Sequence, residues 1–133
     1  MVHKKIFLIV LWVIIVGVVI SAGINYFHNK AVQLNRNGVI KDLHILASDA
    51  QEYYKKPDEQ GDAGKSFHGY KIPQELESNE NGSYSIFSAK TDSLVIKGTG
   101  FETREQNFSF NWGEIITYEI IILPDSTRLR KVY

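Results

Sequence analysis

The stretch IFLIVLWVIIVGVVISAGI, residues 6–24, holds nineteen consecutive residues without a charged side chain. At about 1.5 Å per residue, a helix of this length reaches across the ~30 Å hydrocarbon core of a bilayer. A secretory signal is the main alternative, because Lys4 and Lys5 precede the stretch and small residues occupy positions 21–23. The apolar part of a signal sequence is only about 7 to 15 residues long. We therefore predict a retained transmembrane helix.

A buried helix of a soluble protein is the third interpretation of this stretch. The chain has 133 residues, which allows one small domain beside the apolar segment. A domain of that size has too little core to surround a helix that is apolar on every side. The stretch is thus predicted to face lipid or other protein chains.

The basic residues on the two sides of the stretch predict its orientation. Residues 1–5 carry two lysines, and Lys30, Arg36 and Lys41 follow beyond the other end. These counts are nearly equal under the positive-inside rule, but the two lysines lie directly beside the apolar residues on a short tail. We expect a cytoplasmic N-terminus and an extracytoplasmic C-terminal domain. The chain would then be a single-pass protein of the cytoplasmic (inner) membrane or part of an extracellular filament.

The residues after the stretch continue the helix with a different pattern. No proline occurs between Tyr26 and Tyr54, and apolar residues recur there at steps of three, four and seven. Polar residues such as Asn35 and Asp42 are assigned mainly to the other sides. The pattern predicts one helix from about residue 5 to about residue 55, whose second half covers a sheet. The residues assigned to its packing face are Val39, Ile40, Leu43, Leu46, Ala47, Ala50, Tyr53 and Tyr54.

Beyond residue 82 the pattern changes to a period of two. Four strands are predicted from short segments rich in β-branched or aromatic residues: 83–90, 93–101, 114–123 and 127–133. Thr91-Asp92 and Pro124-Asp125-Ser126 have the composition of tight turns, which favours an antiparallel meander. Polar and aromatic residues alternate over 107–112. This pattern fits a short extra strand or a loop that covers an edge of the sheet.

These elements predict an α+β fold, in which a long N-terminal helix packs on a four-stranded antiparallel sheet. The first half of the helix spans the membrane and the second half is amphipathic. The predicted organisation is a short basic cytoplasmic tail at 1–5, a transmembrane helix at 6–24, its amphipathic continuation at 25–55, a glycine-containing loop region at 56–82 and the antiparallel sheet at 83–133.

The composition argues against several classes of function. The 15 basic and 15 acidic residues balance, so the chain lacks the positive field that favours nucleic acid. No cysteine is present, which excludes disulfides and thiolate chemistry. The four histidines are scattered without acidic partners at ligand spacing, and no set of polar groups converges on a pocket. We expect no enzyme activity, no metal, no cofactor and no nucleic acid partner.

The segment GDAGKS, residues 61–66, has the ending of a phosphate-binding loop, G-x-x-x-x-G-K-[ST]. The first glycine of that pattern falls on Glu59, whose carboxylate would repel a phosphate. Such a loop also leads from a strand into a helix, whereas this segment follows the helix end predicted at Pro57. We interpret it as a flexible corner and expect no bound nucleotide.

The order of these elements resembles that of type IV pilins and of the pseudopilins of type II secretion. Both have an apolar N-terminal helix that continues into an amphipathic half, a variable loop and an antiparallel sheet. The stretch NRNGVIKDLHILASDAQEYYKKP, residues 35–57, followed by SFHGYKIP and NENGSYSI, is also similar to small uncharacterised pilin-like envelope proteins. The processing motif of the family is absent, since no glycine precedes Phe7 and no acidic residue occurs among the ten residues after it.

The resemblance implies a structural subunit that is stored in the membrane and packs with other copies in a filament core. Its partners would be the lipid bilayer and further copies of itself or other pilin-like envelope proteins. The alternative is a bitopic envelope protein whose small extracytoplasmic domain docks on a partner or a membrane complex. Small residues in the apolar stretch favour close approach of helices. The residues assigned to anchoring and assembly are Ile6, Phe7, Leu11, Trp12, Gly17, Ile20, Ala22 and Gly23.

Overall fold

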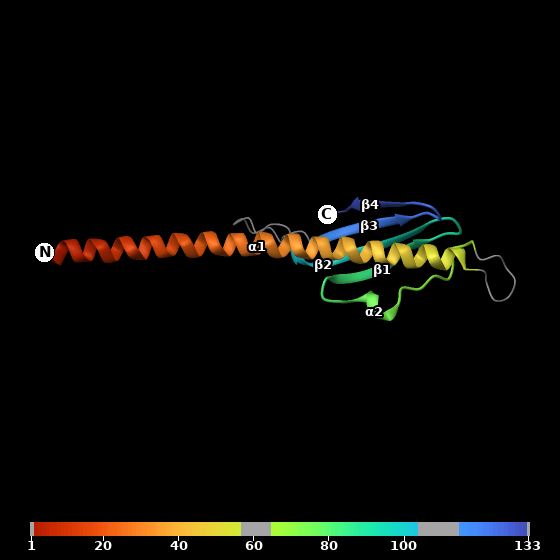
Figure 1. Ribbon diagram of the computed structural model, residues 1–133, viewed down its shortest axis with the longest axis horizontal. Coiled ribbons are helices and arrows are strands. Elements are labelled where there is room, and N and C mark those ends of the chain that lie inside the picture. Colours follow the sequence, from red (N-terminus) through yellow and green to blue (C-terminus); the bar gives the residue numbers. More distant parts are fainter. Residues whose placement is uncertain (1, 57–64, 104–114, 133) are drawn as a thin grey trace. The chain divides into compact units, whose positions relative to one another are not determined.

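The computed structural model describes residues 2–56, 65–103 and 115–132. They form the long helix α1 (Val2–Lys55), the one-turn helix α2 (Gln74–Glu77) and the strands β1 (Gly82–Ala89), β2 (Leu94–Thr103), β3 (Ile115–Ile122) and β4 (Thr127–Lys131), shown in Figure 1. The chain divides into two compact units, Met1–Gln33 and Leu34–Tyr133. The first unit contains the beginning of α1, and the second contains its end, α2 and the strands.

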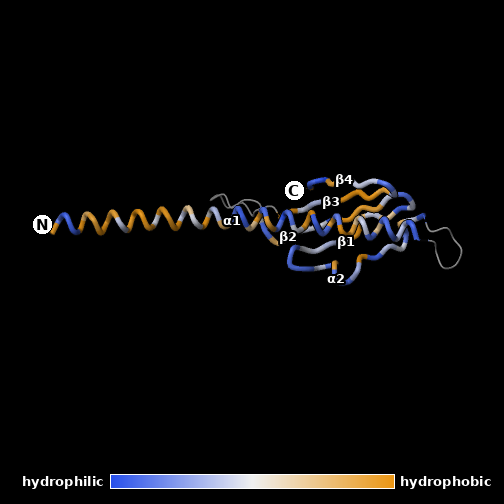
Figure 2. The backbone as a smooth tube through the Cα atoms, in the orientation of Figure 1, coloured by the Kyte–Doolittle hydropathy of each residue, from blue (hydrophilic) through white to orange (hydrophobic). Residues whose placement is uncertain are grey.

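Helix α1 is continuous over 54 residues, in keeping with the absence of proline before position 57. Figure 2 shows that apolar residues fill its N-terminal part and that polar residues become frequent toward its end. Lys55 lies in the last turn, where a cation is favourable beside the partial negative charge of the helix end. Pro57 follows two residues later and disfavours helical geometry in the residue before it. The end of α1 is therefore encoded locally.

The four strands form one antiparallel sheet in the order β1-β2-β3-β4. Two connections are tight, because Lys90 N donates to Ser93 O and Leu123 N donates to Ser126 O, both at 2.8 Å. Each of these hydrogen bonds closes a loop of two residues with the turn composition noted in the sequence. The predicted α+β fold class, a long helix packed on a four-stranded antiparallel sheet, is confirmed. The extra strand considered for residues 107–112 falls outside the described residues.

From Leu34 onward, α1 covers one face of the sheet (Figure 1). Alternate residues of β2 and β3 point to that face and are buried, which matches the period of two in their sequences. The helix contributes to the core the buried side chains Val39, Leu43, Leu46, Ala47 and Ala50. Among the residues that the structure describes, the rest of the core consists of Phe67, Tyr70, Ile72, Tyr84, Leu94, Ile96, Ile116, Tyr118, Ile120 and Ile122. Burial of each large apolar side chain stabilises the fold by roughly 1.5–3 kcal/mol.

Two glycines on the core side of β2 allow α1 to come close to the sheet. A Cβ atom on Gly98 would lie 2.9 Å from the ring of Tyr84 and 3.1 Å from Val39. A Cβ atom on Gly100 would collide with the side chain of Asn35. Atoms of the helix and of β1 thus occupy the space that side chains on β2 would need.

The predicted loop region 56–82 contains ordered elements where the structure describes it. Phe67 is fully buried, and its N–H donates to Thr91 O at 3.1 Å. Helix α2 follows, and one antiparallel bridge joins Ser78 to Ser83 at the start of β1. The segment therefore lies along the β1 edge of the sheet.

Candidate functional site

The described residues contain no group of three or more histidine, aspartate or glutamate side chains that could hold a metal ion. Of the GDAGKS segment, only Lys65 and Ser66 are described. Ser66 Oγ accepts a hydrogen bond from His68 N at 3.1 Å, so this hydroxyl stabilises a local turn. The candidates for function that remain are the apolar part of α1, the polar contacts of its second half and the edges of the sheet.

The first unit presents apolar side chains on all sides of α1. Among the described residues, α1 is the one helix long and apolar enough to cross a membrane. All the large side chains assigned to the anchor are exposed: Ile6, Phe7, Leu11, Trp12 and Ile20. Ala22 is exposed as well, and neither Gly17 nor Gly23 has an atom within 4 Å of its Cβ position. Within one copy of the chain, these residues are left free to meet lipid or other helices.

The residues assigned to the packing face of α1 fall into two groups. Val39, Leu43, Leu46, Ala47 and Ala50 are buried in the core, and Ile40 is half-buried. Tyr53 and Tyr54 instead meet the segment after the helix. The ring centroids of Tyr53 and Tyr70 are 5.5 Å apart, and those of Tyr54 and Phe67 are 4.7 Å apart. The two tyrosines thus hold the segment 67–70 against the end of α1.

A buried carboxylate joins α1 to the start of β1. Asp42 is only 6% exposed. Its Oδ2 accepts hydrogen bonds from Asn79 Nδ2 at 2.9 Å, Asn81 Nδ2 at 2.8 Å and Tyr84 OH at 2.7 Å. A buried charge without partners would be strongly unfavourable, and here three donors from one turn and one strand satisfy it. We call Asn35, Asp42, Asn79, Asn81 and Tyr84 the polar seam.

Asn35 extends the polar seam to the end of β2. Its Nδ2 donates to Asn81 O at 2.7 Å, and its Oδ1 accepts from Phe101 N at 3.2 Å and from Glu102 N at 3.3 Å. Asn81 also lies directly on Gly38, where a Cβ atom would collide with its side chain. Glycine is unfavourable inside a helix by about 1 kcal/mol relative to alanine, and the close approach of Asn81 explains its presence in α1.

The charge of Asp42 is stabilised inside the polar seam. Burial acts to raise the pKa of this carboxyl, but the hydrogen bonds from Asn81, Tyr84 and Asn79, together with the nearby charge of Lys41, act in the opposite direction. Their combined effect holds the pKa of Asp42 below its ordinary value. Burial, followed by the hydrogen bond to Asp42 and its charge, raises the pKa of Tyr84 well above its ordinary value. At neutral pH a neutral phenol therefore donates to a carboxylate.

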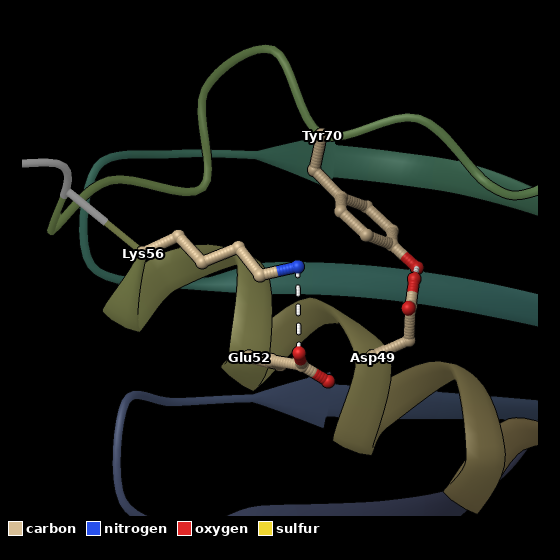
Figure 3. A network of polar contacts seen from close by, with 4 residues as sticks. All are labelled: Asp49, Glu52, Lys56 and Tyr70. Atoms are coloured by element: carbon tan, nitrogen blue, oxygen red, sulfur yellow. Dashed lines mark hydrogen bonds and ion pairs between the residues drawn. The ribbon is translucent and has the colours of Figure 1, made fainter. Parts of the chain in front are cut away.

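A second contact between a tyrosine and an aspartate lies two turns further along α1 (Figure 3). Tyr70 OH donates to Asp49 Oδ2 at 2.7 Å. Burial, then this hydrogen bond and the charge of Asp49, raise the pKa of Tyr70 well above its ordinary value. Lys56 and Glu52 form an ion pair of 3.3 Å nearby, but both side chains are largely exposed. A pair of that kind contributes about 1 kcal/mol at most.

Two further side chains of α1 contact the other half of the sheet. Arg36 Nε donates to Tyr118 OH at 2.5 Å, and the guanidinium lies 6.0 Å from the centre of the Tyr118 ring. Gln51 Nε2 donates to Leu123 O at 3.0 Å. Together with the polar seam, these contacts determine where the helix sits along the strands.

On the face of the sheet that points away from α1, the described strands carry one buried acid, Glu119. Glu119 is 5% exposed, and its cross-strand neighbours are Lys97 on β2 and Arg130 on β4. Arg130 Nη2 lies 2.5 Å from Glu119 Oε2, while most of the arginine side chain remains exposed. The ion pair neutralises Glu119 and attaches β4 to β3.

The sequence pattern does not predict the polar seam. Asp42 lies three residues after Val39 and four before Leu46, so it shares their side of the helix, and its assignment to another side is wrong. An acid at this spacing within an apolar stripe is a signal for a buried, hydrogen-bonded carboxylate. The side chains of two turn formers before β1, Asn79 and Asn81, hold the acid.

Comparison with protein families, with curated proteins and with solved structures found no match for this chain.

Proposed function

We propose that the chain is a structural subunit of the pilin-like or pseudopilin-like kind, anchored in a membrane by residues 6–24 and assembling through them. The observation that carries this proposal is that the two parts of α1 have different surroundings. Its N-terminal part exposes apolar side chains on every side, and its part from Leu34 onward packs on the sheet. No loop separates the two parts. Contacts between copies at residues 6–24 would therefore gather chains that each carry a sheet domain.

Residues at the two ends of the apolar stretch support membrane anchoring. Lys4 and Lys5 precede it, and Tyr26 and Phe27 follow it with exposed rings that meet edge to face at 6.0 Å. Aromatic side chains are enriched where a membrane-spanning helix leaves the hydrocarbon core. On this proposal the chain is a single-pass protein of the cytoplasmic membrane with its sheet domain outside the cytoplasm.

The middle of the stretch supports contact with other helices. Gly17 and Gly23 are small and open on the outside, which lets the backbone of a neighbouring helix approach closely. Trp12 is 67% exposed and lies well inside the stretch, whereas tryptophan prefers the ends of a membrane span. A neighbouring helix would cover this ring and remove it from the lipid.

The hydrogen bonds within the polar seam favour a structural role over a catalytic one. Asn79, Asn81 and Tyr84 each donate a hydrogen bond to Asp42, and both ends of the Asn35 amide form hydrogen bonds within the fold. Catalytic groups need free donors or acceptors directed at a substrate. These groups hold the helix on the sheet instead.

Cross-linking in native membranes tests the proposal, and the natural chain contributes no cysteine of its own. We would examine Val13→Cys/Val18→Cys, because these exposed positions lie about 140° apart around the helix. Two reactive faces allow chains of adducts, so assembly predicts a ladder of self-adducts. The variant with Val18→Cys alone is the control, and its adducts should stop at dimers.

The alternative makes a different prediction in the same experiment. A bitopic protein that docks on another membrane complex gives one discrete heteromeric band and no ladder. Absence of self-adducts in chains that remain in the membrane would overturn the assembly proposal. The intact mass of the native protein reports separately whether residues near its N-terminus are removed.

A further inference from the structure

The two edges of the sheet carry opposite charge. β4 is exposed along its whole length and contains Arg128, Arg130 and Lys131 without an acid. At the other edge, α2 lies beside β1 (Figure 1), and the stretch 74–81 contains the exposed acids Glu75, Glu77 and Glu80 without a base. In the strand order β1-β2-β3-β4, these groups lie on opposite sides of one small sheet.

β4 also presents unpaired backbone groups. The hydrogen bonds Leu123 N to Ser126 O and Val132 N to Thr117 O fix its register on β3. In an antiparallel pair the direction of the backbone groups alternates, so those of Thr127, Leu129 and Lys131 point away from β3. Among the described residues β3 is the only strand beside β4. An exposed edge of this kind favours contact with another chain unless its charges prevent it.

The charges of β4 disfavour pairing with the same strand of a second copy. Arg130 is paired with Glu119, so antiparallel β4–β4 contact would bring Arg128 and Lys131 of each copy near the basic side chains of the other, which is unfavourable across a strand pair. Simple addition of β4 to the free edge of β1 is also obstructed. Ser78 already bridges to Ser83, and Asn79 N donates to Gly82 O at 3.0 Å, so the start of that edge is occupied.

We propose that β4 of one copy meets the acidic edge formed by α2 and residues 78–80 of a second copy, through side chains of opposite charge. This contact is heterologous, so each copy keeps a free edge after the first contact, and the arrangement extends to a ring or an open filament. The inference rests on the proposed function, because it takes the partner to be another copy of this chain.

The experiment uses two tagged copies of the full chain, produced together in native membranes. One carries Gln74→Cys in α2, and the other carries Thr127→Cys in β4; both positions are exposed, and neither change alters a charge. A short bifunctional thiol reagent should give the mixed adduct. Each variant produced alone should give little adduct, because like edges do not meet.

Charge reversal tests the attraction itself. Glu77→Lys in the Gln74→Cys copy should lower the yield of mixed adduct roughly threefold to tenfold, since exposed pairs contribute little each and the reversal adds repulsion. Arg128→Glu in the other copy should restore it. Asp92→Lys, an equal charge change in the exposed loop between β1 and β2, is the matched control and should leave the yield unchanged.

The outcomes separate this inference from the proposed function. A ladder from Val13→Cys/Val18→Cys without the mixed edge adduct would overturn the edge contact and leave assembly through α1 intact. Predominance of β4–β4 adducts, or equal effects of Glu77→Lys and Asp92→Lys, would also overturn it. Absence of both the ladder and the edge adduct would overturn the proposed function and this inference with it.

Discussion

Residues 6–24 and residues 34–55 belong to one helix, yet their apolar side chains have different surroundings. In the first segment large residues cover all sides and are exposed within the chain, whereas in the second they form one stripe that the sheet buries. Burial in the second segment is driven by removal of apolar surface from water. The first segment can gain the same stabilisation only from lipid or from other helices. The distribution of apolar residues around a helix, rather than their number, thus decides what kind of partner it requires.

The largest expected effect concerns the buried stripe. Leu46→Ala should lower the free energy of unfolding by about 2–5 kcal/mol, because Leu46 is fully buried and the change leaves a cavity. Leu34→Ala is the matched control on the same helix, since Leu34 is 62% exposed and should change stability by about 0.5 kcal/mol at most. Denaturation of the full chain in detergent micelles, followed by circular dichroism, measures both. Equal losses would contradict the burial pattern.

A charge in the first segment should affect membrane retention instead of folding. Val16→Asp places a carboxylate near the middle of the apolar stretch, which disfavours insertion by about 2.5–3.5 kcal/mol. We expect a large fall in the protein that remains in membranes after an alkaline wash. Ser48→Asp, at an exposed position in the second segment, should be retained like the natural chain. Full retention of Val16→Asp would show that this segment does not lie in lipid.

The polar seam predicts a specific dependence of stability on pH. Asp42→Asn should lower the free energy of unfolding at pH 7 by about 1–2 kcal/mol, because hydrogen bonds to a charged acceptor are worth more than those to a neutral one. The pKa of Asp42 is lower in the folded chain than its ordinary value. Its contribution is therefore complete above the unfolded pKa of about 3.9 and disappears as the pH falls through the folded value.

The variant Asp42→Asn should lack this acid-dependent part of the stability.

Tyr84→Phe gives the opposite test at alkaline pH. The pKa of Tyr84 is raised on folding, so its contribution is complete below the unfolded pKa of about 10 and is lost as the pH rises above it. Unfolding curves at pH 3, 7 and 11 compare the variants with the natural chain. Identical pH profiles for all three proteins would contradict the described hydrogen bonds.

The smallest effect compares two glycines of α1. Gly38→Ala improves helix propensity by about 1 kcal/mol but forces a Cβ atom into Asn81, and overpacking of this kind is unfavourable by about 1–3 kcal/mol. We expect a net loss of about 1 kcal/mol in the same denaturation experiment. Gly17→Ala meets no atom within 4 Å and should leave the unfolding of the sheet domain unchanged. A stabilising Gly38→Ala would contradict the contact with Asn81.

The helix and the strands were predictable because their signals are local. A period of 3.6 along α1, a period of two in the strands and turn formers between them are all read within short windows. The polar seam was not predictable in this way. Asp42 and Tyr84 are 42 residues apart, and Gly98 looks like a weak position of a strand until the helix above it is placed. Pairings of this kind depend on how separate elements meet.

The separation of α1 from its partners in the sequence has a consequence for synthesis. Arg36 contacts Tyr118, 82 residues later. At a synthesis rate of about 5–20 residues per second, the stripe from Val39 to Ala50 waits roughly 4–16 s before β3 exists to cover it. During that interval the stripe lacks β3 and β4, because only β1 and β2 precede β3 in the chain. Apolar surface exposed in a nascent chain favours contact with neighbouring chains, so strands of another copy compete with the chain's own β3 for the stripe.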